Sequence, residues 1–320
     1  MARIGQGECV IISDVVRAGG SVGLRSLFTS KVRQKVCCEI NVVDHCNITC
    51  RDCNHGSPGV AERFIDPDQL GRELSALKRH YLPSTIKLIG GEPLLHPQLL
   101  EVIRVVRESG IAPRILLVTN GILLPKMEDE LWRAIDALDV SIYPKPGLSD
   151  ETVELIKSRA AAFNVELELL QFSEFRVQYS THNNRDSTLT RRIFESCRMV
   201  QLWRCDVIHD GYFYRCPQSI YGPRLAGEQT PFEHDRLRIE DSLRFRKRLS
   251  DFRHSQQPLA ACRYCLGTAG MTRTHQLERK NLWSSTIEAP VETVVDIPFM
   301  ERAEQDIRLR QGCRKKMQEG

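Results

Sequence analysis

The chain has 320 residues, a length that suits about two domains of ordinary size. Hydrophobic residues make up 41% and charged residues 27% of it, which excludes a disordered or collagen-like protein. No apolar run approaches the roughly 18 residues of a membrane span, and Asp14 interrupts the short apolar stretch where a signal peptide would have its core. The formal net charge of +4 is too small to indicate nucleic-acid binding. We therefore expect a cytoplasmic protein that binds neither nucleic acid nor membranes.

Strand and helix patterns alternate through the first half of the chain, after residues 1–36, which carry no clear motif and are interpreted as an N-terminal extension. Apolar runs predict strands at 38–44, 85–89, 114–119, 138–143 and 165–170, and helical spacing predicts helices at 67–80, 97–109, 127–137 and 149–163. From the second strand on, strand starts recur every 24–29 residues, which is the period of a βαβ unit and predicts a mainly parallel sheet. Periodicity does not distinguish a doubly wound sheet from a barrel. In both, ligands bind at the carboxyl ends of the strands.

Cysteine is the unusual residue of this composition. Twelve cysteines in a chain without an export signal indicate metal binding or catalysis, not disulfides. Cys46, Cys50 and Cys53 follow the first predicted strand directly, in the sequence CNITCRDC. Three thiolates on one loop suit an iron–sulfur cluster that keeps one iron open for another ligand, whereas structural zinc requires four protein ligands. The alternative for this loop is a zinc knuckle completed by His45 or His55.

The second predicted strand ends in the sequence Gly90-Gly91-Glu92-Pro93. Two glycines allow the backbone to approach a ligand closely. Glu92 adds a carboxylate, and because both strands end at the same edge of the sheet, we expect it beside the cysteine loop.

The motifs CNITCRDC and LIGGEPLLHP, followed by LLVTNG, resemble those of the radical S-adenosylmethionine (SAM) enzymes over roughly residues 38–172. The resemblance implies an α/β fold with a partial (β/α)6 TIM-like barrel. It also implies a [4Fe–4S] cluster on Cys46, Cys50 and Cys53, with SAM bound to the open iron. The SAM contacts that it implies are Gly90, Gly91 and Glu92, with Asn120 and Ser141 as further candidates.

The chain departs from the family pattern at two places. Asp52 stands where the family often has an aromatic residue before the third cysteine. The glycine-rich adenine motif often found on the fifth strand is absent from VELELLQF. No residue is therefore assigned to the adenine.

A second cysteine group follows in RCDVIHDGYFYRC, which has the alternation and the Asp-Gly turn of a β-hairpin, and in CRYC. From Cys197 through Gly211 to Cys216 the spacing is C-x13-G-x4-C, and C-x2-C follows at Cys262 and Cys265. This pattern resembles the twitch domain of radical SAM enzymes, which is a shortened SPASM domain. This resemblance implies an auxiliary [4Fe–4S] cluster held by Cys197, Cys216, Cys262 and Cys265. On spacing alone, zinc is an equal alternative. Cys205 is left over as a replacement ligand for Cys197, a hydrogen-atom donor to a substrate radical, or a buried hydrophobic residue.

The domain organisation follows from these two resemblances. Residues 37–195 are interpreted as the radical SAM core and residues 196–285 as the twitch/SPASM-like domain. Residues 286–320 are interpreted as a charged, helical tail.

The resemblance implies an enzyme that cleaves SAM reductively to a 5′-deoxyadenosyl radical. The radical takes a hydrogen atom from a small sugar- or cyclitol-type substrate, and the outcome is oxidation or epimerisation. An electron donor such as flavodoxin or ferredoxin is the implied partner. One alternative is maturation of a ribosomal peptide, although residues 1–36 are too few for a winged-helix recognition module. The other is a non-catalytic metal-binding or redox-sensing protein, which would not cleave SAM.

Overall fold

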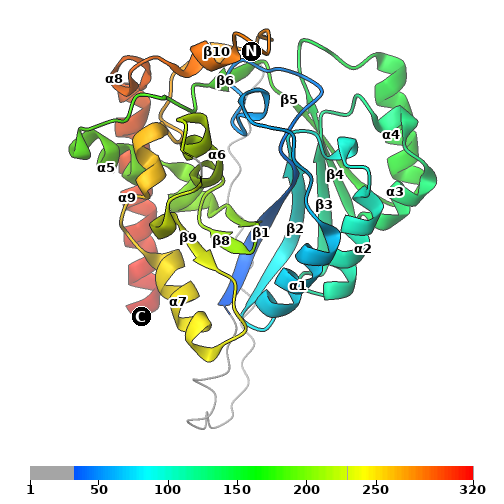
Figure 1. Cartoon of the computed structure of the whole chain (residues 1–320), viewed down its shortest axis with the longest axis horizontal. Coiled ribbons are helices and arrows are strands. Elements are labelled where there is room, and N and C mark those ends of the chain that lie inside the picture. The colour runs from blue at the N-terminus through cyan, green and yellow to red at the C-terminus, as the bar shows by residue number, and fades with distance from the viewer. Residues whose placement is uncertain (1–31, 229, 320) are drawn as a thin grey trace. The chain divides into compact units, whose positions relative to one another are not determined.

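A mainly parallel sheet organises the computed structural model, which describes residues 32–228 and 230–319 (Figure 1). Its five parallel strands are β1 (Val32–Val43), β2 (Tyr81–Gly90), β3 (Arg114–Thr119), β4 (Ala137–Ile142) and β5 (Glu166–Gln171). The helices that connect them are α1 (Pro67–Leu77), α2 (Leu99–Ser109), α3 (Asp129–Ala134) and α4 (Asp150–Ala162). This repeat confirms the predicted α/β class and is consistent with a partial barrel. The described residues form no closed barrel.

The predicted strands and helices all occur, with shifts at their ends. β1 begins at Val32 and not at residue 38, so it crosses the boundary drawn between the N-terminal extension and the core. Residues 1–31 of that extension lie outside the described residues. The helix predicted at 127–137 ends at Ala134, because Ala137 already pairs with Leu116 of β3 and Glu166 of β5.

The two faces of the parallel strands have different compositions. One face packs on the connecting helices and is apolar, with Ile40 and Leu88 fully buried against Leu74 of α1. Each such side chain contributes about 1.5–3 kcal/mol of burial free energy. We call the opposite face the inner face. Its polar members include Cys37, Glu39, Asn41, Thr85, Lys87, Asp139, Ser141 and Glu168.

Beyond β1 the sheet continues with parallel β7 (Asp206–His209) and then with antiparallel β8 (Tyr212–Tyr214) and β9 (Arg236–Arg238). β7 and β8 form the predicted hairpin. Asp210 and Gly211 in its turn have φ values of 48° and 78°, as a two-residue type I′ turn requires.

The remaining elements surround this second half of the sheet (Figure 1). A separate two-stranded sheet pairs β6 (Glu174–Arg176) with β10 (Thr272–Thr274). The helices are α5 (Ser187–Ser196), α6 (Gln218–Leu225), α7 (Leu243–His254), α8 (Val291–Val294) and α9 (Ile297–Glu319). α9 confirms that the charged tail is helical.

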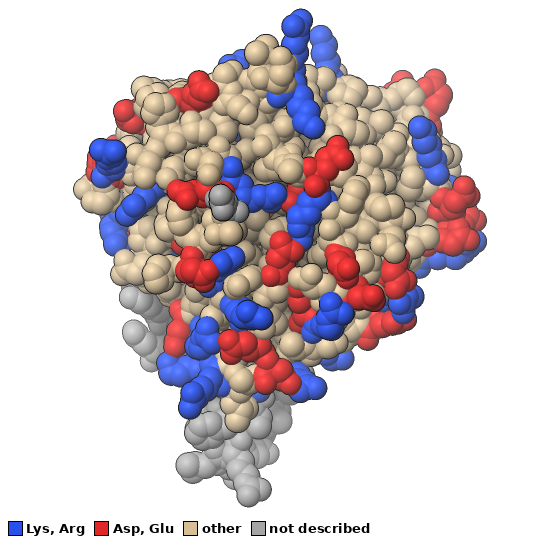
Figure 2. Space-filling view, in the orientation of Figure 1, with Lys and Arg blue, Asp and Glu red and all other residues tan. Residues whose placement is uncertain are grey.

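The surface mixes both signs of charge. Figure 2 shows Lys and Arg side chains interspersed with Asp and Glu over the visible face, in keeping with the small net charge. Within the described part of the chain, no helix combines the length and apolarity that crossing a bilayer requires.

A buried ion pair ties α7 to the sheet. Arg253 Nε donates to the Asp206 carboxylate at 2.8 Å, and both side chains are only 4% exposed. The hydroxyl of Tyr81 donates to the same oxygen at 3.0 Å. Burial raises the pKa of Asp206 to about 6, since desolvation outweighs the attraction of Arg253. The pair is costly to bury and depends on both partners being present.

We expect Asp206→Asn to lower the free energy of unfolding by about 3 kcal/mol, because Arg253 would stay buried without its carboxylate. Anaerobic guanidinium denaturation followed by circular dichroism measures this. The matched control is Asp241→Asn, which breaks an exposed ion pair with Arg79 and should cost no more than about 1 kcal/mol. Equal effects of the two substitutions would contradict the prediction.

Candidate active site

The three cysteines of CNITCRDC lie together on the loop that follows β1. Burial raises the pKa of the Cys46 thiol to about 12, and the nearby Cys53 adds to this effect. Burial also raises the pKa of Cys50, whose thiol lies within electrostatic range of both Cys46 and Cys53. Three thiols that are held protonated by burial, and that would repel one another as thiolates, suit a positively charged group that binds all three.

The GGEP turn packs directly on the backbone of this loop. The amide of Gly91 donates to the Val43 carbonyl at 2.8 Å, and the amide of Glu92 donates to the His45 carbonyl at 3.0 Å. A Cβ atom at Gly91 would lie 1.9 Å from the His45 oxygen, so only glycine permits the contact. The backbone of the GGEP turn therefore approaches the cysteine loop closely. Contact of Gly90 and Gly91 with SAM stays a prediction.

Glu92 is fully buried at the same edge. One carboxylate oxygen accepts from the Thr119 hydroxyl at 2.6 Å and from the Leu94 amide at 3.1 Å. The other oxygen accepts from the Asn120 amide at 2.8 Å. Burial raises the pKa of Glu92, and these donors oppose the rise. Glu92 thus joins the end of β2 to the end of β3.

Asn120 and Ser141 also lie near the cysteine loop. The Asn120 side chain donates to Asn47 Oδ1 at 2.6 Å and lies 3.7 Å from Cys46 Sγ. Ser141 is buried on β4 and shares a hydrogen bond with the Tyr143 side chain. Burial raises the pKa of the Tyr143 hydroxyl, and the nearby Cys50 adds to the rise. The carboxyl ends of β2, β3 and β4 therefore bring the predicted SAM contacts to one edge.

Sequence reasoning missed two residues of this site, Tyr143 and His275. Nε2 of His275 lies 3.2 Å from Cys50 Sγ, and the imidazole stacks on the Tyr143 ring with centroids 5.1 Å apart. Burial lowers the pKa of His275 and so favours the neutral ring, which can donate its Nε2 proton to Cys50 when that sulfur is a thiolate. Tyr143 could have been found two positions after Ser141, on the same face of one extended strand. No local signal marks His275.

Residues 275–286, which we call the closing segment, run along the cysteine loop. The amide of Arg51 donates to the Gln276 carbonyl at 2.8 Å, and the amide of Glu278 donates to the Thr49 carbonyl at 2.9 Å. These bonds give the loop a strand-like partner. The loop is therefore completed by residues more than two hundred positions away.

Two side-chain contacts reinforce this closure. The indole of Trp283, which is fully buried, donates to the Cys50 carbonyl at 2.8 Å. Arg273, the central residue of β10, pairs with Asp52 at 3.4 Å. Asp52, the residue that departs from the family pattern, thus has a structural partner.

The two histidines proposed for a zinc knuckle have other contacts. Nδ1 of His55 lies 2.8 Å from Asn54 Oδ1, and burial lowers the pKa of His55 to about 4. His45 packs edge-on against Phe64, with ring centroids 5.0 Å apart. His45 Nδ1 and His55 Nε2 have no hydrogen-bond partner among the described residues, so the zinc alternative stays open.

The second cysteine group lines a single small cavity. Its four cysteines come from the end of α5, from the residues after β8, and from the 3₁₀ helix Ala260–Tyr264 and its C-terminus. They are Cys197, Cys216, Cys262 and Cys265, and apolar side chains such as Ile193, Phe194 and Leu259 line the same cavity. Burial raises the pKa of all four thiols, and Cys216 lies within electrostatic range of the other three.

Polar groups of the protein point at these sulfurs. The amide of Gly267 donates to Cys265 Sγ at 3.2 Å, and the Gln178 side chain donates to it at 3.1 Å. Gly267 has a φ of 57°, and a Cβ atom there would lie 2.9 Å from Cys197 Sγ. Hydrogen bonds to cysteine sulfurs are one of the means by which proteins tune iron–sulfur clusters.

Among residues 32–228 and 230–319, no three His, Cys, Asp or Glu side chains are placed to hold a single metal ion. Three other features of the two cysteine sets suit an iron–sulfur cluster, which is larger than a single ion. The thiols are shielded from solvent, the thiols of each set lie within electrostatic range of one another, and the second set shares one cavity.

Residues 40–170 match the model of the family described as the Radical SAM superfamily. A GTP 3',8-cyclase of Microcystis aeruginosa is 32% identical over 120 residues, which cover 33% of this chain and 36% of that protein. A probable GTP 3',8-cyclase of Methanocaldococcus jannaschii is 26% identical over 170 residues, which cover 50% of this chain and 54% of that protein. The chain thus spans about a third to a half of the length of these curated relatives.

Among solved structures, BtrN in complex with AdoMet and 2-DOIA has a TM-score of 0.42 and 19% identity, over 70% of this chain and 84% of that one. The similarity is too low to carry a functional argument. The family match is different, because residues 40–170 contain β1 from Ile40 onward, the cysteine loop and the GGEP turn. Residues 40–170 of this chain are a radical SAM domain.

Proposed function

We propose that this chain is a radical SAM enzyme with two iron–sulfur clusters that takes a hydrogen atom from a small polar molecule. The first cluster is held by Cys46, Cys50 and Cys53, and the second by Cys197, Cys216, Cys262 and Cys265. When bound and reduced, the first cluster and SAM supply the 5′-deoxyadenosyl radical. The family match and the burial of each cysteine set support this proposal.

The residues beside the cysteine loop have the task of orienting SAM. Glu92 is immobilised by three donors, and Asn120 bridges the end of β3 to the loop. A carboxylate and an amide fixed in this way form a preorganised edge for a polar ligand, which reduces the entropy that binding costs.

The main support for this substrate class is that the side-chain amide of Asn41, on the inner face, lacks hydrogen-bond partners among the described residues. Its side chain is fully buried, and neither amide atom has a hydrogen-bond partner within the described residues. A buried amide without partners costs about 1–3 kcal/mol. Hydroxyl or amino groups of a sugar- or cyclitol-type molecule would satisfy it.

The charges near Asn41 favour such a molecule over a nucleotide, the substrate class for which the curated relatives are named. Lys87 Nζ lies 3.6 Å from a Glu39 carboxylate oxygen, and Asp139 also lies within its electrostatic range. The ammonium charge is therefore already compensated. The inner face offers little attraction to a triphosphate and suits a neutral or amine-bearing ligand.

Cys205 bears on the choice between oxidation and epimerisation. Its thiol is half-buried and lies within electrostatic range of Glu39 and Lys87, close to the inner face. The cavity of the second cysteine set includes Cys197 and does not include Cys205. This position supports Cys205 as a hydrogen-atom donor in an epimerisation. Without such a donor, the substrate radical would have to lose one electron, for which the second cluster would be the acceptor, and one proton to solvent, giving an oxidised product.

Anaerobically reconstituted protein is expected to hold about eight irons and eight sulfides per chain, as two four-iron clusters. Replacing Cys46, Cys50 and Cys53 together by Ala should leave about four irons, and so should replacing Cys216 and Cys262. Cys205→Ala is the matched control. This variant should keep all eight irons, because Cys205 lies outside the cavity of the second cysteine set. One zinc per chain with only about four irons would overturn the second cluster.

We expect His275→Phe to keep the ring stack on Tyr143 and to lose the hydrogen bond to Cys50. That bond favours the more negative, reduced state of a cluster. Losing about 1 kcal/mol of this stabilisation of the reduced state should make the reduction potential of the first cluster more negative by roughly 40 mV. A redox titration followed by electron paramagnetic resonance measures the change. Leu277→Ala, an exposed residue of the closing segment, should leave the potential unchanged. An unchanged reduction potential in His275→Phe would contradict the proposal that His275 donates a hydrogen bond to a cluster ligand.

Aminocyclitols or amino sugars should stimulate 5′-deoxyadenosine formation by the enzyme, whereas GTP should not. Asn41→Leu should reduce this stimulation about tenfold, the equivalent of about 1.4 kcal/mol, because the ligand loses its amide partner. The same substitution should raise the free energy of unfolding, since it removes an unpaired buried amide. Stimulation by GTP alone would favour a nucleotide substrate and contradict the proposal.

A further inference from the structure

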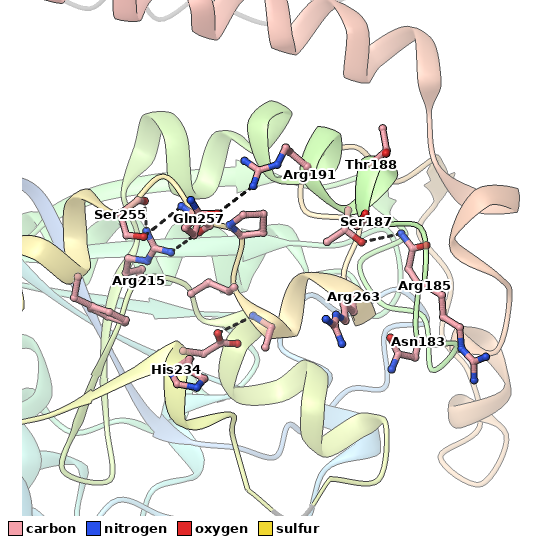
Figure 3. Close-up of a pocket in the computed structure, with 17 residues that line it drawn as sticks. Asn183, Arg185, Ser187, Thr188, Arg191, Arg215, His234, Ser255, Gln257 and Arg263 are labelled. Atoms are coloured by element: carbon pink, nitrogen blue, oxygen red, sulfur yellow. Dashed lines mark hydrogen bonds between the residues drawn. The ribbon is translucent and has the colours of Figure 1, made fainter.

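Figure 3 shows a second cavity, of about 860 Å³. Its volume falls in the range of roughly 300–1,000 Å³ that is typical of small-molecule sites. It is bounded by residues 183–191 at the start of α5, by Arg215, by His234 and Asp235, and by residues 252–263. Leu259 lines both this cavity and the cavity of the four cysteines.

The side chains that line this cavity carry an excess of positive charge. Four arginines contribute to it, namely Arg185, Arg191, Arg215 and Arg263, against the single carboxylate of Asp235. Both oxygens of Asp235 already accept backbone amides, from Ala260 at 2.7 Å and Ala261 at 2.8 Å. The carboxylate holds the wall of the cavity in place and lies within electrostatic range of Arg215. Arg191 lies 3.8 Å from the Glu195 carboxylate. Among the described residues Arg185 and Arg263 form no ion pair, so the excess positive charge lies mainly on these two.

Arg215 is the buried member of this group, with 5% of its surface exposed. Its guanidinium donates to two neutral acceptors, the carbonyls of Ser255 and Gln257, and lies over the Phe252 ring. Its Nε atom has no partner among the residues that the structure describes. The hydrogen bonds of this buried cation go to neutral carbonyls, and negative charge nearby stabilises it, of which Asp235 supplies a part.

Gln257 links two of the arginines on one wall. Arg191 donates to Gln257 Oε1 at 3.1 Å, and Arg215 donates to the Gln257 carbonyl at 2.9 Å, as Figure 3 shows. Arg263 comes from the 3₁₀ helix between Cys262 and Cys265, and Arg191 and Arg263 are exposed. A cluster on the cysteines would place negative charge near Arg215. It would leave the exposed arginines facing the cavity.

We propose that this cavity binds a small molecule that carries phosphate or carboxylate groups. Planar guanidinium groups pair with both oxyanions through two parallel hydrogen bonds, and several of them around one recess select for multiple negative charge. The cavity shares no residue with the inner face or with the GGEP edge. Its ligand is therefore a second molecule, distinct from the substrate that loses hydrogen.

The test is isothermal titration of the anaerobic, cluster-loaded protein with inorganic pyrophosphate and with citrate, at constant ionic strength. Saturable binding of either anion is expected, and the tighter of the two identifies phosphate or carboxylate as the preferred group. The double substitution Arg191→Gln and Arg263→Gln should weaken that binding at least tenfold. Both side chains are exposed, so the fold should persist.

Arg308→Gln is the matched control, since it removes the same charge from an exposed position on α9 and should leave the affinity unchanged. Two results would overturn the proposal. One is that neither anion binds more tightly than chloride. The other is that the double variant binds pyrophosphate and citrate as well as the unaltered protein does.

Discussion

The cysteine loop keeps its shape because backbone hydrogen bonds hold it from two sides. On one side the amides of Gly91 and Glu92 donate to the end of β1 and to His45. On the other side the closing segment pairs with Thr49 and Arg51. The loop itself has little regular structure, so these external partners fix where its sulfurs point. A site of this kind needs a rigid surround, because its chemistry depends on position more than on acid–base groups.

The parallel strands divide their residues between stability and function. The face on the helices is apolar and fully buried, and its many side chains supply the burial free energy of the fold. The inner face carries an unpaired amide at Asn41 and a compensated charge pair at Glu39 and Lys87. Such groups weaken a fold when no ligand is present. The apolar face offsets that cost, which lets the inner face be shaped for recognition.

Local sequence signals predicted the repeating elements and the residues nearest to them. Hydrophobic periodicity located five strands and four helices, and cysteine spacing located both sets of buried thiols. The start of β1 was missed because its first residues, VRQK, are polar, yet the strand pairs with Tyr81–Pro83 through its backbone. His275 and Trp283 were missed because their partner, Cys50, lies more than two hundred positions away. Periodicity has no access to such contacts. The arginine-lined cavity was invisible for the same reason, since its walls come from four separate segments.

The closing segment also has a consequence for the order in which the site is assembled during folding. Cys50 and His275 are 225 positions apart, so the loop is synthesised long before its cover. Closing so long a loop costs little extra at equilibrium, because the entropy grows only by about 0.6 kcal/mol with each doubling of length, but distant contacts form slowly. Until those contacts form, Cys50 lacks the cover of His275 and Trp283. After closure the same sulfur is buried. The separation of the two halves of the site along the chain therefore makes the burial of Cys50 a late step of folding.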